Sequence, residues 1–216
     1  MKELPREVEE RYGIVLGVVL PVTVSPTQLQ MLRAAETESE KNWSIVLLIF
    51  SGANVMAHGE TDSGRLRLPE FRIPSDLLDL DEFEATLKEK VFLEYGLKID
   101  LSRYLMLGHC TFMSDSPVEG DESDTSSRTL HLFTARALNS DDLVAKEQPI
   151  GVARLVKPNL LADSLQREWA DVRAQLNTGG TSQNMRDDYN ASWAFVRSRL
   201  VALAFQKLFG WELPEV

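Results

Sequence analysis

The chain has 216 residues, of which 44% are hydrophobic and 26% charged, as in a soluble globular domain with or without appended elements. Its formal net charge of −10 disfavours nucleic acid and anionic membranes as partners. A single cysteine, Cys110, excludes a disulfide framework and indicates a reducing compartment. The first residues are charged and contain no apolar signal core, so we expect a cytoplasmic protein.

The pattern of the first third of the chain predicts strands with one helix between them. Residues 14–24 and 43–50 are apolar runs typical of buried strands, and residues 55–58 return beside the second run as a hairpin. A capping box starting at Ser25 predicts a helix. Residues 65–73 alternate as a strand, whose two prolines place it at a sheet edge or a bulge.

The next segment predicts an amphipathic helix at residues 81–95. Phe83, Leu87 and Val91 recur every four residues, and Gly96 follows as the residue that ends the helix. Further elements are expected in this order: a strand at 103–113, an acidic loop at 114–127, strands at 128–137 and 150–156, and two apolar helices at 161–176 and 189–209.

Three segments resemble parts of the Nudix hydrolase family. Glu94-Tyr95-Gly96-Leu97 is similar to the end of the Nudix box, and Phe71-Arg72-Ile73-Pro74 resembles the segment that enters it. Residues 130–136 resemble the strand after the box in hydrolases of the ADP-ribose type. The resemblance covers about residues 43–138. It implies a Nudix-like α/β/α sandwich with a mixed sheet, in which residues 1–156 form the domain and 157–216 a C-terminal helical extension packed on it.

The same resemblance implies a degraded metal site. With Gly96 set as the last glycine of the box, Glu94 matches one carboxylate of the family pattern, but Lys90 and Leu93 stand where two others belong. Those carboxylates hold divalent cations that bridge pyrophosphate oxygens and activate water. Glu94 is thus the candidate catalytic residue. If the protein is active, Mg²⁺ or Mn²⁺ is the expected cofactor, held by Glu94 with carboxylates from elsewhere, such as Asp81, Glu89 or the acidic loop at residues 115–124.

Three cations are candidates for binding an anionic ligand. Lys90 and Glu94 are four residues apart on one helical face, so they form either an ordinary surface pair or a site that contacts phosphate. Arg65 and Arg67 share one side of the predicted strand. They either meet an anion in the family's ligand pocket or protect an exposed sheet edge from aggregation.

Three hypotheses about function remain open. The first is a catalytically weak or inactive Nudix-like module that binds a nucleotide or another small anionic ligand, or interacts with a protein. The second is a divergent hydrolase that cleaves a nucleoside diphosphate derivative, similar to ADP-ribose, with a divalent metal. The third is an assembly subunit that forms a homodimer or binds another protein through the two C-terminal helices. The alternative for these helices is that they cover the open face of the sheet.

Overall fold

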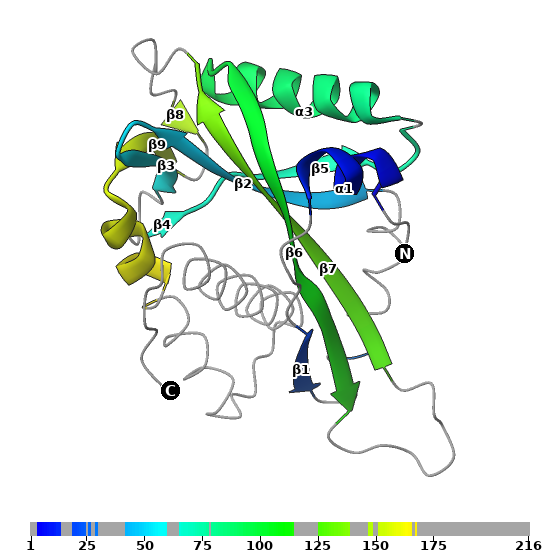
Figure 1. Ribbon diagram of the computed structural model, residues 1–216. Helices are drawn as coiled ribbons and strands as arrows, with labels where there is room; N and C mark the ends of the chain where they lie inside the picture. Colours follow the sequence, from blue (N-terminus) through cyan, green and yellow to red (C-terminus); the bar gives the residue numbers. More distant parts are fainter. Residues whose placement is uncertain are drawn as a thin grey trace.

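A nine-stranded mixed sheet organises the molecule (Figure 1). The structure is a computed structural model that describes residues 4–13, 19–24, 26, 29, 42–59, 65–77, 79–114, 125–138, 147–148, 151–165 and 167. The main path of the sheet runs β1-β6-β7-β2-β3-β9-β8, while β4 pairs with β3 and β5 pairs with β2. The strands are β1 (Val19–Val24), β2 (Asn42–Ser51), β3 (Asn54–Gly59), β4 (Leu66–Arg67), β5 (Glu70–Pro74), β6 (Ile99–Ser114), β7 (Thr125–Ala137), β8 (Glu147–Gln148) and β9 (Gly151–Val156).

Two parallel pairs make the sheet mixed. Strand β1 runs parallel to the far end of β6, and β2 runs parallel to β7, whereas the other pairs are antiparallel. Strands β6 and β7 form a long twisted pair that crosses the whole molecule (Figure 1). The predicted α/β class with a mixed sheet is therefore confirmed.

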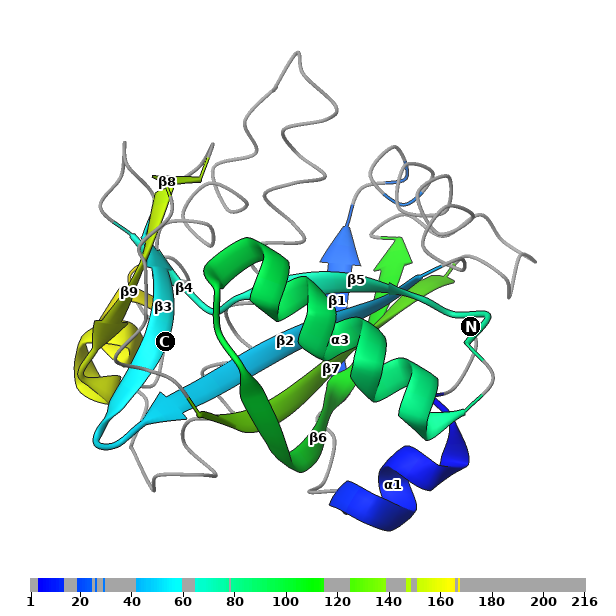
Figure 2. The same cartoon turned by 90° about the horizontal axis from the view of Figure 1, so that it is seen from above.

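Helix α3 (Leu80–Tyr95) lies across one face of this sheet, and α1 (Arg6–Tyr12) lies near the N-terminal end of α3 (Figure 2). In this view α3 runs between β5 on one side and the start of β6 on the other (Figure 2). Within the described ranges, no helix is long and apolar enough to cross a membrane.

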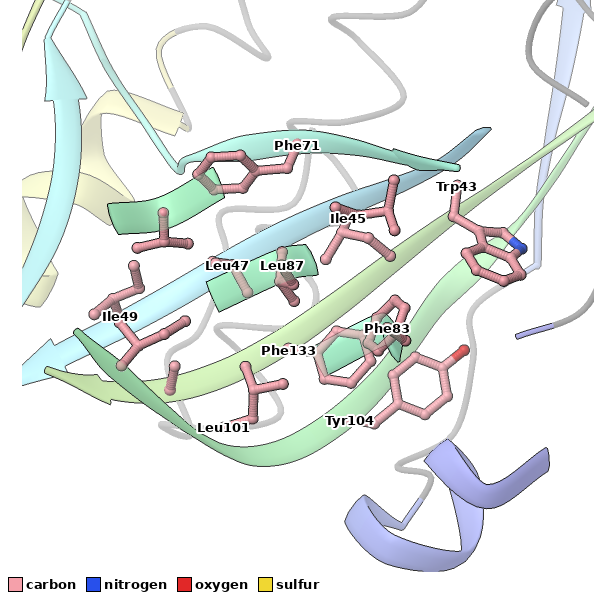
Figure 3. Packing of buried hydrophobic residues seen from close by; sticks show 14 of the residues in the cluster. Trp43, Ile45, Leu47, Ile49, Phe71, Phe83, Leu87, Leu101, Tyr104 and Phe133 are labelled. Atoms are coloured by element: carbon pink, nitrogen blue, oxygen red, sulfur yellow. The ribbon is translucent and has the colours of Figure 1, made fainter. Parts of the chain in front are cut away.

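The core fills the space between α3 and the sheet (Figure 3). Phe83, Leu87 and Val91 of α3 are fully buried, as the four-residue spacing predicted. They meet inward-facing residues of the sheet, with Phe133 tilted against Phe83 at 5.5 Å between ring centroids. The opposite face of β2 and β7 is buried too, because Val46, Leu48 and Leu132 are at most 1% exposed. A sheet buried on both faces agrees with a sandwich.

One predicted strand is split into two. The prediction of a single strand at residues 65–73 is wrong, because β4 pairs with β3 while β5 pairs with β2. The break falls at Leu68 and Pro69, where proline has no N–H to donate to a ladder. The carbonyl of Pro69 still accepts a hydrogen bond from the Leu47 N–H at 2.9 Å, which fixes the register of β5 on β2.

Other predictions fall partly outside the described residues. The hairpin of β2 and β3 is confirmed by the facing pairs Phe50–Val55 and Ser51–Asn54. Residues 158–165 are helical, which agrees with the start of the first C-terminal helix. The acidic loop is shorter than predicted, because residue 114 belongs to β6 and residues 125–127 to β7. Its residues 115–124, most of the helix expected after Ser25 and most of both C-terminal helices, with the subunit contact predicted there, lie outside the described part of the chain.

Candidate functional site

Local sequence fixes both ends of α3. The Asp79 side chain accepts a hydrogen bond from the Glu82 N–H at 2.9 Å and caps the first turn. Gly96 ends the helix with φ of +71°, a left-handed conformation that glycine adopts without strain. The buried stripe turns one flank of the last two turns, with Lys90 and Glu94, toward β5.

An open groove of about 400 Å³ lies between that flank and β5. It is lined by three consecutive residues of β5 and three of α3, namely Glu70, Phe71, Arg72, Lys90, Leu93 and Glu94. Because Pro69 accepts from Leu47, the alternation of an antiparallel ladder points the backbone N–H and C=O of Glu70 and Arg72 away from β2. The groove therefore follows the outer edge of β5.

Lys90 and Glu94 both line this groove, but they do not form an ion pair within 4.0 Å in the described part of the chain. The carboxylate of Glu94 instead accepts a hydrogen bond from the hydroxyl of Tyr95. The pair that does form on α3 is Lys88 with Glu84, at 2.5 Å. Both interpretations of Lys90, as a surface charge and as a contact for phosphate, stay predictions.

Tyr95 connects the groove to the protein interior. Its ring is 3% exposed and packs edge-on against Phe71 at 6.0 Å, while its hydroxyl lies 3.2 Å from Nδ1 of His58 on β3. Burial raises the pKa of Tyr95, and the hydrogen bond to Glu94 and the charge of that carboxylate raise it further. Tyr95 therefore stays a phenol, able to donate, at any working pH.

Arg65 and Arg67 do not line the groove. Both are half-buried near β4, and Arg67 stands opposite His58 in the pairing of β4 with β3. The cation that β5 brings to the groove is Arg72, which is exposed. The split at Pro69 explains the difference, because it sends the two halves of the predicted strand to different partners. Ligand binding by Arg65 and Arg67 stays a prediction.

Asp81 and Glu89 are not brought together with Glu94. Asp81 lies 13 residues earlier, about 20 Å along the helix axis, and Glu89 is rotated by about 140° from Glu94. Glu89 lines a different groove of about 350 Å³, on the other side of α3, with Phe92, Leu97 and Ile99. Across the described ranges, no three His, Cys, Asp or Glu side chains are grouped as a metal would need.

The sequence contained a signal for only part of this site. Glu94 was recognised from its match to the Nudix box, and Lys90 from its place four residues before Glu94. Glu70, Arg72, Tyr95 and His58 were not assigned to the site. Arg72 follows from strand alternation once the break at Pro69 is known. His58 is 37 residues from Tyr95 in the chain, and no local pattern connects the two.

A second buried pair repeats the combination of tyrosine and histidine away from the groove. The hydroxyl of Tyr104 on β6 lies 2.7 Å from Nδ1 of His131 on β7, and the two rings stack at 5.9 Å. Burial lowers the pKa of His131 to about 4, so the imidazole is neutral at physiological pH. This pair offers a matched comparison for the pair of Tyr95 and His58.

Comparisons with known proteins give a partial likeness. No family model matches the sequence, and no curated protein matches it. A NUDIX hydrolase from Nitrosomonas europaea is 11% identical with a TM-score of 0.36, over 57% of this chain and 62% of that one, so less than two thirds of its length is spanned. The mutator MutT protein from Bacillus halodurans is 13% identical with a TM-score of 0.37, over 57% of this chain and 72% of that one.

A Nudix family hydrolase from Clostridium perfringens is 11% identical with a TM-score of 0.34, over 74% of this chain and 98% of that one. All three TM-scores are below 0.5. The fold class, α/β with a mixed sheet, follows from the pairing of the strands.

Proposed function

We propose that this protein is a Nudix-like module that binds an anionic ligand, of the nucleoside diphosphate kind, in the groove between β5 and α3 without a divalent cation. One observation carries the proposal. Lys90 and Arg72 line the same groove from opposite sides, and neither takes part in the ion pairs of the described part of the chain.

These two cations suit phosphoryl oxygens. A guanidinium presents paired N–H donors to phosphate, and an ammonium adds a point charge. The ladder alternation also points the backbone N–H of Arg72 to the outer edge of β5, where it is a further donor. A volume of about 400 Å³ lies in the range of small-molecule sites. Each of these features supports a small anionic ligand.

The side chains of the groove do not fit Mg²⁺ or Mn²⁺. Lys90 and Arg72 stand among the carboxylates of Glu70 and Glu94, so a dication in the groove would lie beside an ammonium or a guanidinium that repels it. Mg²⁺ prefers an octahedron of oxygens, with several carboxylates and waters. An ammonium one helical turn from Glu94 occupies the position from which a second carboxylate of α3 would reach the same point.

A divergent hydrolase remains the alternative, favoured by one observation. Glu70 brings a second carboxylate to the groove, on the wall opposite Glu94, which the sequence comparison with the Nudix box had not counted. This alternative requires turnover of a nucleoside diphosphate derivative with Mg²⁺ or Mn²⁺, and loss of that turnover in Glu94→Gln. Assay of ADP-ribose and related compounds with each metal distinguishes it from the binding module.

Charge removal tests the binding proposal. Lys90→Gln and Arg72→Gln should each weaken the binding of ADP by about 10-fold, the value of one charge-assisted hydrogen bond. The matched controls are Lys157→Gln and Arg154→Gln, which remove exposed cations outside the groove. Equal loss in all four variants would show that only the overall charge of the protein matters, and would contradict a site at the groove.

A further inference from the structure

Behind the groove, three side chains form a continuous hydrogen-bonded chain. His58 on β3 contacts the Tyr95 hydroxyl through Nδ1 at 3.2 Å, and that hydroxyl also bonds the carboxylate of Glu94, which lines the groove. His58 is 8% exposed and Tyr95 is 3% exposed, so the chain begins in the interior and ends at the groove. The two rings meet edge-on, 6.3 Å between centroids.

The positions of the protons in this chain follow from hydrogen-bond strength. The phenol has one proton, and a carboxylate is a stronger acceptor than a neutral imidazole, so the Tyr95 O–H donates to Glu94. The phenol oxygen then accepts from His58, which must carry its proton on Nδ1. Nε2 of His58 is buried and has no hydrogen-bond partner in the described ranges. We therefore expect Nε2 to carry no proton, because an unsatisfied buried N–H donor is rarer than an unsatisfied acceptor.

We propose that Tyr95 and His58 are positioning residues that fix the Glu94 carboxylate as a hydrogen-bond acceptor at the groove. The inference rests on the proposed function, and it adds a requirement on the ligand. Beside the anionic group held by Lys90 and Arg72, the ligand presents a hydrogen-bond donor, a hydroxyl or an amine, to the carboxylate of Glu94.

Two probes separate this inference from the proposed function. Inorganic pyrophosphate carries the anion alone, whereas ADP carries a diphosphate with two ribose hydroxyls. Binding of pyrophosphate to the wild-type protein supports the proposed function, and its absence overturns that function. Tyr95→Phe removes the hydroxyl but keeps the ring on Phe71. We expect it to weaken ADP about 5-fold and leave pyrophosphate unchanged.

The matched control is Tyr104→Phe, which removes the hydroxyl of the other buried tyrosine that contacts a histidine. It should leave the affinities for both probes unchanged. A double-mutant cycle adds a direct measure of coupling: Glu94→Gln and Tyr95→Phe together should weaken ADP no more than Glu94→Gln alone. Equal loss of both probes in Tyr95→Phe, or additive losses in the cycle, would overturn the positioning role.

A measurement on the intact protein avoids any dependence on variants that fold poorly. Nitrogen-15 chemical shifts of the histidine side chains distinguish a protonated Nδ1 from a protonated Nε2. The hydrogen-bonded chain requires His58 to be protonated on Nδ1 with Nε2 bare. A spectrum in which His58 carries its proton on Nε2 would mean that Tyr95 donates to the imidazole rather than to Glu94, and would overturn the inference.

Discussion

The hydroxyl of Tyr12 donates a hydrogen bond to the carboxylate of Glu84, and this bond joins α1 to α3. Glu84 is 6% exposed, and its carboxylate also meets Lys88 at 2.5 Å and Arg11 at 3.3 Å. Burial alone pushes the pKa of Glu84 up. The hydrogen bonds from Lys88 and Tyr12 and the two positive charges outweigh burial, so the net shift of the pKa is downward.

Replacing Glu84 with glutamine should lower the free energy of unfolding by about 1–3 kcal/mol at pH 7, because a buried acceptor of charge-assisted bonds is lost. Since the folded state lowers the pKa of Glu84, its stabilisation is present above the unfolded value of 4.5 and is lost as pH falls below it. Urea unfolding at several pH values measures both effects. Glu89→Gln, at an exposed position of the same helix, is the control.

His131 should give the protein a second pH dependence, between about pH 4 and 6.5. Burial lowers its pKa from 6.5 to about 4, so in this window the unfolded chain binds a proton and the folded protein does not. Stability therefore rises with pH across the window, by roughly 3 kcal/mol at most. His131→Phe should remove this slope.

Tyr104→Phe separates burial from the hydrogen bond to Tyr104 as the cause of the lowered pKa of His131. It removes the hydroxyl that contacts Nδ1 but leaves the imidazole buried. Because burial causes the shift of the pKa, the slope should persist in this variant even if the overall free energy of unfolding falls. Disappearance of the slope in Tyr104→Phe would assign the pH dependence to the hydrogen bond instead.

The packing of α3 against the sheet should be the main contribution of this helix to the free energy of unfolding of the protein. Leu87 of α3 is fully buried and lies among the labelled core residues of Figure 3, so Leu87→Ala should lower the free energy of unfolding by about 2–5 kcal/mol through lost burial and a cavity. Leu93→Ala is the matched control, because Leu93 is 64% exposed and its loss should cost less than about 0.5 kcal/mol. Equal losses would contradict the observed face of α3.

Features determined by neighbouring residues were predicted correctly from the sequence. The helix at residues 81–95 agrees with α3, since the spacing of Phe83, Leu87 and Val91 and the glycine at 96 are local signals. The prolines of residues 65–73 predicted a sheet edge or a bulge, but the change of partner strand at Pro69 was not predicted, because alternation continues through it and only pairing with β2 and β3 reveals it. Arg72 was consequently missed as a residue of the groove.

The partners of the side chains in the groove could not be predicted from the sequence, because they depend on long-range contacts. Lys90 and Glu94 have the spacing of an ion pair, but Glu94 bonds to Tyr95, whose position depends on Phe71 and His58. Which partner a side chain chooses is decided by packing between elements, and helical spacing alone does not contain that information.

Lys90→Glu should reverse the ionic preference of the groove. It places a carboxylate four residues before Glu94, so two carboxylates of α3 then face one point. This variant should bind Mg²⁺ more tightly than the wild-type protein. Without metal it should bind ADP more weakly by about 1–2 kcal/mol, the loss of one charge-assisted bond. Calorimetry with Mg²⁺ alone and with ADP in EDTA tests both changes, and unchanged affinities would contradict a role for Lys90 in the groove.

The most direct measurement is the affinity of the wild-type protein for ADP, by calorimetry in EDTA and again with Mg²⁺ at millimolar concentration. Binding by Lys90 and Arg72 without a metal predicts the same affinity in EDTA as in the titration with Mg²⁺, once the share of ADP already complexed by free Mg²⁺ is taken into account. Binding that occurs only when Mg²⁺ is present would contradict metal-independent binding and would favour the divergent hydrolase.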